Sequence, residues 1–123
     1  MIQQTIHVLA VPDLEKSAAY YRDVLGFTIE DIGDPGWRMY RKDRCRIMAG
    51  HCPDATPPEA LGDHSYFAYF VVDNVDEYFL QVSQAGAEII KPLRSEPWDM
   101  REFAIRTLDG HRIMIGQDLN VSS

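Results

Sequence analysis

The pattern of hydrophobic and polar residues in this chain occurs twice. An apolar, strand-like stretch over residues 5–11 runs into a helix-like stripe, and the same order returns about half-way along the sequence. The junction Val11-Pro12-Asp13-Leu14-Glu15 has its counterpart 61 residues later, in Val72-Asp73-Asn74-Val75-Asp76. An internal repeat of this length predicts two equivalent structural units.

In the first half, the spacing predicts a strand over 5–11, a helix, and further strands over 27–31, 37–42 and 44–48. Asp13 is suited to cap the helix, and Gly26 is suited to end it in the left-handed conformation. The apolar residues with helical spacing, which should face the core, are Leu14, Ala18, Tyr21 and Leu25.

The second half repeats this order. A strand is predicted over 65–72, then a helix capped by Asn74 and closed by Gly86, then strands over 89–93, 101–106 and 112–117. The helix stripe consists of Val75, Phe79 and Val82. We therefore expect one α+β domain over residues 1–123, with module one at about 1–50, a proline-rich linker at about 51–64, and module two at about 65–123. The two βαβββ modules should form a curved, cleft-enclosing sheet with the helices outside.

Composition narrows the classes of function. The net charge is −7 and no basic stripe is present, so nucleic acid is not an expected partner. No apolar run is long enough to predict a membrane span, and no basic region precedes an apolar stretch at the N-terminus, so we expect a cytoplasmic protein. Cys45 and Cys52 are then expected to be free thiols.

Residues 38–46 are the nearest approach to a basic cluster, with five basic residues and one acid. Their alternation with apolar residues favours the solvated face of a hairpin. An acidic protein also attracts cationic ligands, which bears weakly on the choice of ligand.

Two segments suggest a family. Val11-Pro12-Asp13-Leu14-Glu15-Lys16-Ser17, with Tyr20-Tyr21-Arg22-Asp23-Val24-Leu25-Gly26-Phe27, resembles the opening of the vicinal-oxygen-chelate superfamily, which includes glyoxalase I, extradiol dioxygenases, and fosfomycin- and bleomycin-resistance proteins. The segment Pro97-Trp98-Asp99-Met100-Arg101-Glu102-Phe103-Ala104 resembles the Trp-x-x-Arg-Glu-Phe-Ala pattern of bleomycin-resistance-type proteins. Thr107-Leu108 departs from it, because the family usually has Asp-Pro there.

The resemblance implies a divalent metal in the members that are enzymes, held by a His on the first strand of each half and a carboxylate late in each half. Aligned on the two helix caps, three of these positions fall on Ile6, Phe67 and Met114, and Met48-Ala49-Gly50 offers no carboxylate in the first half. His7 is one residue out of register and should face the helix. We therefore expect no metal and no cofactor.

Aromatic residues suggest a ligand site instead. By alternation, Phe67 and Tyr69 should face the groove beside Ile6 and Met114, where flat or cationic ligands could bind; these side chains could equally fill the groove themselves. Trp98 lies in a loop, where an exposed indole would be unusual unless it packs on a ligand or partner. The candidate ligand-binding residues are Ile6, Trp37, Phe67, Tyr69, Trp98, Glu102 and Met114.

These observations favour a metal-free protein that sequesters a flat or cationic small molecule in an aromatic groove, with no catalytic residue. The resemblance implies a homodimer. Two alternatives remain: a metal-dependent lyase, isomerase or dioxygenase with relocated ligands among His7, His51, His64 and Glu102, and an accessory domain whose groove is filled by its own side chains.

Overall fold

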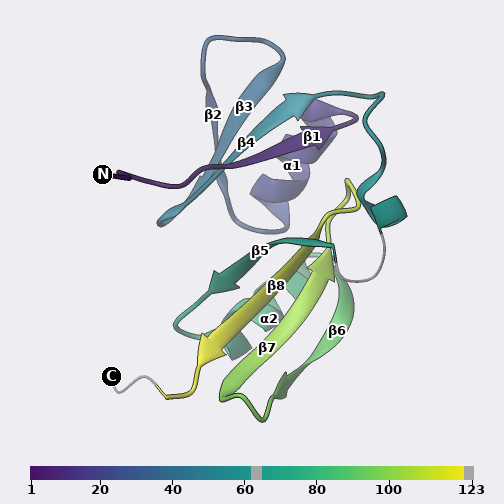
Figure 1. Ribbon diagram of the computed structural model, residues 1–123. Helices are drawn as coiled ribbons and strands as arrows, with labels where there is room; N and C mark the ends of the chain where they lie inside the picture. The colour runs from purple at the N-terminus through teal and green to yellow at the C-terminus, as the bar shows by residue number, and fades with distance from the viewer. Residues whose placement is uncertain (62–64, 121–123) are drawn as a thin grey trace. The chain divides into compact units, whose positions relative to one another are not determined.

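Each half of the chain forms a four-stranded sheet with a helix packed on one face (Figure 1). The computed structural model describes residues 1–61 and 65–120. The chain divides into two compact units, Met1–Pro57 and Pro58–Ser123. Both have the order β-α-β-β-β, so the predicted α+β class and the predicted duplication are confirmed.

The first unit contains β1 (His7–Val11), α1 (Leu14–Asp23), β2 (Thr28–Asp31), β3 (Trp37–Lys42) and β4 (Cys45–His51). Its strand order is β1-β4-β3-β2, with β1 parallel to β4 and the other neighbours antiparallel. Strand β4 is longer than predicted, because its pairing with β1 continues to His51.

The core of the first unit lies between the sheet and α1. The predicted stripe Leu14, Ala18, Tyr21 and Leu25 is buried. Beneath it, Tyr40 and Ile47 are buried, and the Tyr40 hydroxyl donates a hydrogen bond to Ser17 Oγ at 2.8 Å. His7 is paired in register with Ile47, so it lies on the helix side, as predicted. The neighbouring Val8 lies on the open face of the sheet and is 58% exposed.

The second unit contains η1 (Pro58–Leu61), β5 (Tyr66–Val71), α2 (Val75–Gln84), β6 (Glu88–Ser95), β7 (Met100–Arg106) and β8 (Arg112–Asp118). Its strand order is β5-β8-β7-β6, which matches that of the first unit. The short helix η1 lies in the predicted linker, and His64, at the end of that linker, lies outside the described residues.

Strand β6 is longer than the predicted 89–93 and is irregular. Its pairing with β7 shifts register on either side of Lys91. Pro92 lies in this strand and cannot donate to a ladder, which restricts it to an edge strand or a bulge. Strand β6 is the edge of its sheet, so the proline is accommodated there.

The core of the second unit lies under α2. Phe103, Ile105, Ile113 and Ile115 are fully buried, and Phe79 packs edge-on against Phe103 with ring centroids 5.1 Å apart. Val75 and Val82 are buried as predicted, and α2 also buries Tyr78, which the predicted stripe omitted. No helix among residues 1–61 and 65–120 is long and apolar enough to span a membrane.

The helix caps reproduce the repeat at atomic detail. The Asp13 carboxylate accepts a hydrogen bond from the Lys16 amide at 3.0 Å, and the Asn74 side chain accepts one from the Glu77 amide at 3.1 Å. Each satisfies a main-chain donor that the first turn of a helix leaves unpaired. Equivalent sequence positions therefore begin equivalent helices.

Candidate functional site

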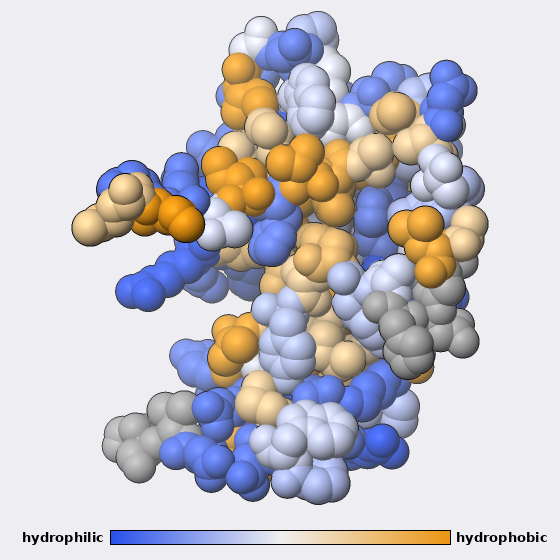
Figure 2. All heavy atoms as spheres, in the orientation of Figure 1, coloured by the Kyte–Doolittle hydropathy of each residue, from blue (hydrophilic) through white to orange (hydrophobic). Residues whose placement is uncertain are grey.

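Neighbouring strands of the second unit gather predicted site residues on the face of the sheet opposite α2. Tyr69 is paired in register with Met114, and Glu102 with Gly116. Since side chains alternate along a strand, and Phe103 and Ile115 face the helix, Glu102 and Met114 point to the opposite side. Figure 1 shows α2 behind β7 and β8, so Figure 2, in the same orientation, views this open face, where hydrophobic side chains lie among polar ones.

Glu102 is the centre of this cluster. Its carboxylate accepts hydrogen bonds at Oε1 from the Tyr69 hydroxyl and from Trp98 Nε1, both at 3.0 Å. At Oε2 it accepts one from Lys91 Nζ, at 2.5 Å. The residue is only 3% exposed. Three predicted site residues (Tyr69, Trp98 and Glu102) thus form one hydrogen-bonded group.

The network keeps Glu102 ionised. Burial pushes the pKa of its carboxyl upward, but hydrogen bonds from Lys91, Trp98 and Tyr69 outweigh this and lower the pKa below its ordinary value. Burial, together with the hydrogen bond to Glu102, raises the pKa of Tyr69, which stays a neutral donor. A carboxylate with a lowered pKa and both oxygens engaged is a poor general base.

A second buried carboxylate completes the charge balance. Glu96 is 7% exposed, lies 3.8 Å from Lys91 Nζ through Oε1, and pairs with the guanidinium of Arg94. The two carboxylates are therefore matched by two cations. Lys91 Nζ also lies 5.5 Å from the centroid of the Trp98 ring, within the range of a cation–π contact.

A glycine makes room for Tyr69. A Cβ atom at Gly116 would lie 2.2 Å from the Tyr69 hydroxyl oxygen, so the tyrosine reaches Glu102 by passing directly over this position. The first unit has an equivalent close approach of an aromatic side chain to a glycine. A Cβ at Gly50 would lie 2.7 Å from the nearest ring carbons of Trp37, its partner in register. In both units a glycine near the end of the last strand admits a predicted aromatic residue.

The cluster leaves aromatic surface exposed. Trp98 is 59% exposed and Tyr69 is 42% exposed, although both polar atoms are held by Glu102. Rings held in this way lose little conformational freedom when a flat molecule packs on them. The arrangement of Trp98, Tyr69 and Glu102 can therefore bind a flat molecule, but it offers no activated nucleophile.

The remaining predicted site residues are Ile6, Trp37, Phe67 and Met114. Ile6 precedes β1 and Trp37 begins β3, both in the first unit, and both are partly buried. Phe67 lies where the pairing of β5 with β8 shifts register, and its ring packs edge-on against His111 at 5.7 Å. The simple alternation that grouped Phe67 with Tyr69 is therefore interrupted at this point. Met114 is partly buried beside Tyr69.

Sequence reasoning missed Lys91, Glu96 and Gly116. Lys91 lies on β6, where the pairing with β7 shifts register on both sides of this residue. Regular alternation along the strand therefore could not predict that Lys91 contacts Glu102. For Lys91 and Glu96, the available signal was the charge pattern Lys91, Arg94 and Glu96 beside Trp98. Gly116, in an otherwise apolar strand, is a recognised sign of a close approach by another group.

The residues present do not suit the metal site of the enzymes that this sequence resembles. Ile6 and Phe67 have no donor atom, and Met114 offers only a thioether, which is a poor ligand for hard divalent ions. Within residues 1–61 and 65–120, no three His, Cys, Asp or Glu side chains come together as a metal-binding group. Cys45 and Cys52 are free thiols, as predicted.

Comparisons with known proteins agree with this architecture. A curated bleomycin resistance protein from Geobacillus stearothermophilus is 28% identical over 131 residues, covering 94% of this chain and 97% of the relative. The crystal structure of a bleomycin resistance determinant encoded on the transposon Tn5 superposes with a TM-score of 0.77 at 21% identity, covering 95% of this chain and 98% of the other. TnmS3, an antibiotic binding protein from Streptomyces sp. CB03234, superposes with a TM-score of 0.76 at 18% identity, covering 96% and 97%.

The two structural matches establish the fold, and a match to a family sequence model establishes the family. The sequence model of the glyoxalase/bleomycin resistance protein/dioxygenase superfamily matches residues 3–115, which is nearly the whole chain. This protein therefore belongs to the glyoxalase/bleomycin resistance protein/dioxygenase superfamily.

Proposed function

We propose that this protein binds a flat or cationic small molecule against Trp98 and Tyr69, on the open face of the second unit, without a metal and without covalent chemistry. It would act by sequestration, as a cytoplasmic homodimer. The observation that carries the proposal is the buried Glu102 carboxylate, which holds two exposed aromatic rings in place through hydrogen bonds of 3.0 Å.

Flatness of the ligand is supported by the geometry of these rings. A preordered indole and phenol present apolar surface that stacking can bury, and such contacts add to simple burial of area. Lys91 occupies one side of the Trp98 ring, so a ligand would stack on the other side. A cationic ligand is supported by the net charge of −7 alone.

Binding without metal is supported by the side chains at the positions where related enzymes hold their ligands. Those positions carry Ile6, Phe67 and Met114, and Glu102, the carboxylate nearest to the exposed rings, already accepts from three donors. Sequestration is further supported by the curated relative at 28% identity, which is a bleomycin resistance protein and spans the same length.

A binding experiment with two probes tests the proposal. Bleomycin is chosen because of the relative, and proflavine because it is a flat aromatic cation. Each is titrated into the protein by isothermal calorimetry, with and without EDTA. Trp98→Ala is compared with Leu108→Ala, which removes an equally exposed apolar side chain (59%) from a turn of the same unit.

We expect saturable binding of at least one probe, unchanged by EDTA. Trp98→Ala should weaken it by about 1–3 kcal/mol, the scale of a lost aromatic contact, and Leu108→Ala should leave it within about 0.5 kcal/mol. Absence of binding by both probes would contradict the proposal. Binding that EDTA abolishes would instead favour a metal-dependent site.

A further inference from the structure

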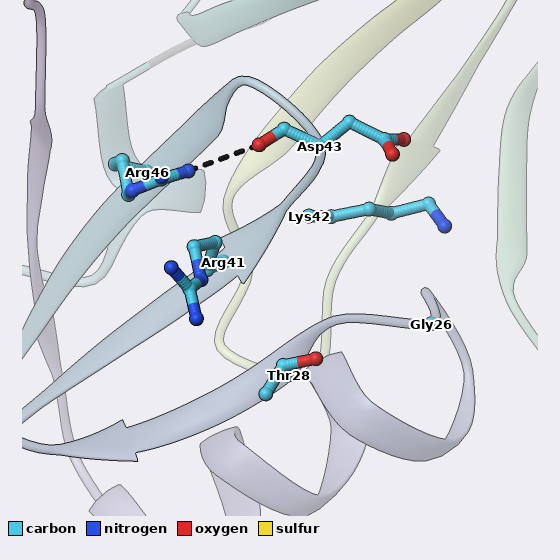
Figure 3. Close-up of a pocket in the computed structure, with 6 residues that line it drawn as sticks. All are labelled: Gly26, Thr28, Arg41, Lys42, Asp43 and Arg46. Atoms are coloured by element: carbon cyan, nitrogen blue, oxygen red, sulfur yellow. Dashed lines mark hydrogen bonds between the residues drawn. The ribbon is translucent and has the colours of Figure 1, made fainter.

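A basic pocket lies at the end of the β3–β4 hairpin in the first unit. It has a volume of about 360 Å³ and is lined by Gly26, Thr28, Arg41, Lys42, Asp43 and Arg46 (Figure 3). Three of these six residues are basic and one is acidic, in a chain whose net charge is −7. The local charge is therefore opposite in sign to that of the whole protein.

Two arginines face each other across the hairpin. Arg41 on β3 is directly paired in register with Arg46 on β4, so both side chains leave the sheet on the same face. Like charges in directly opposed positions of an antiparallel pair destabilise the sheet. Figure 3 shows the two side chains next to each other, with the Arg41 guanidinium directed toward Thr28 on β2. An unfavourable pairing of like charges, retained in the fold, is typical of a ligand-binding site.

The surrounding contacts only partly neutralise these cations. Arg41 Nε lies 3.0 Å from Glu30 Oε1, in a half-exposed ion pair. The Arg46 guanidinium donates to the main-chain carbonyls of Asp43, at 3.0 Å, and Cys45, at 3.4 Å. These carbonyls orient the guanidinium, but they carry no formal charge to cancel it. Each guanidinium has five N–H donors, so these contacts leave donors for another acceptor.

We propose that this pocket binds a phosphate group through Arg41 and Arg46. Guanidinium groups recognise phosphate oxygens through paired hydrogen bonds, and two adjacent ones relieve their mutual repulsion by sharing a dianion. The Thr28 hydroxyl supplies a further donor at the pocket wall. The volume admits a phosphate monoester as well as inorganic phosphate. This site is separate from the aromatic cluster and does not depend on the function proposed for it.

The test uses inorganic phosphate as the probe, at pH 7.5 and constant ionic strength, with chloride as the reference anion. Binding is measured by isothermal calorimetry and by the rise in thermal midpoint. The variants are Arg46→Gln, Arg41→Gln and Arg46→Lys. Arg22→Gln is the matched control, because Arg22 is an exposed arginine on α1, paired with Asp23, outside the pocket.

At ten times its dissociation constant, phosphate should raise the thermal midpoint of the unaltered protein and of Arg22→Gln by roughly 5 °C over chloride. Arg46→Gln and Arg41→Gln should each weaken phosphate binding at least about tenfold. Arg46→Lys should retain part of the affinity, since it keeps the charge and loses the planar fork. The proposal is overturned if phosphate has no effect beyond that of chloride. It is equally overturned if both glutamine variants bind phosphate as the unaltered protein does.

Discussion

Replacement of Glu102 by glutamine should destabilise the protein and do so in a pH-dependent way. Glutamine keeps the shape, and its carbonyl can still accept from Tyr69 and Trp98. Its amide would, however, put a second donor where Lys91 Nζ now lies 2.5 Å from a carboxylate oxygen. Loss of a hydrogen bond to a charged group costs about 1.5–3 kcal/mol. For a chain of this length, this corresponds to a fall of about 6–12 °C in the thermal midpoint.

The pH dependence follows from the lowered pKa of Glu102. A carboxyl with a depressed folded-state pKa stabilises the native state above its unfolded value, 4.5, and this stabilisation is lost as the pH falls through the folded-state pKa. The difference in stability between the unaltered protein and Glu102→Gln should therefore be constant from pH 7 to about 5.5 and shrink at lower pH.

The assay is urea unfolding followed by circular dichroism at pH 7, 5.5, 4 and 3. Glu30→Gln is the control, because Glu30 pairs with Arg41 at the surface, and such exposed pairs contribute about 0–1 kcal/mol. A Glu102→Gln variant as stable as the Glu30→Gln control, or a stability difference that grows below pH 4.5, would refute the reasoning.

Three further predictions concern packing and reactivity. Gly116→Ala should destabilise the protein by about 1–3 kcal/mol and displace Tyr69, because the new methyl group would lie 2.2 Å from the tyrosine oxygen; chemical denaturation and the tyrosine NMR signals measure this. Iodoacetamide at pH 8 should alkylate Cys52 well before Cys45, since Cys52 is exposed and burial raises the pKa of the Cys45 thiol to about 11; mass spectrometry over time follows it. Tyr40→Phe should cost about 0.5–1.5 kcal/mol in urea unfolding, because it removes a buried hydrogen bond of 2.8 Å.

Each of these has an outcome that contradicts it. Gly36→Ala is the glycine control, since its Cβ would meet only ordinary contact distances; equal effects of the two alanines would argue against the close approach of Tyr69. Equal alkylation rates would contradict the burial of Cys45. An unchanged free energy of unfolding for Tyr40→Phe would mean that its hydroxyl contributes nothing to the core.

The repeat and its helices could be predicted because they depend on local signals. Asp13 and Asn74 cap their helices through contacts three residues away, and the apolar stripes follow the helical period. Strict alternation also placed His7 and Val8 on opposite faces of β1. The fold could therefore be predicted where the backbone is regular.

The candidate site was only partly predictable, because it depends on irregular backbone and on long-range contacts. The register shift beside Phe67 interrupts the alternation used to group it with Tyr69. Register shifts around Lys91 bring its side chain to Glu102, eleven residues later in the sequence. No regular spacing in the sequence indicates this contact. Tyr69 can pass over Gly116 because this residue, 47 positions away in the sequence, lacks a side chain. Such contacts become visible only once the strands are paired.

The most direct test of the account is an NMR titration of the two tryptophan indole N–H signals, from Trp37 and Trp98, with bleomycin and with proflavine in the presence of EDTA. Signals are assigned by replacing each tryptophan with phenylalanine. We predict that the Trp98 signal shifts along a saturable curve, with the affinity found by calorimetry. A Trp98 signal that stays fixed while calorimetry reports binding would contradict the assignment of the site. Fixed signals together with no detectable binding would contradict the proposed function itself.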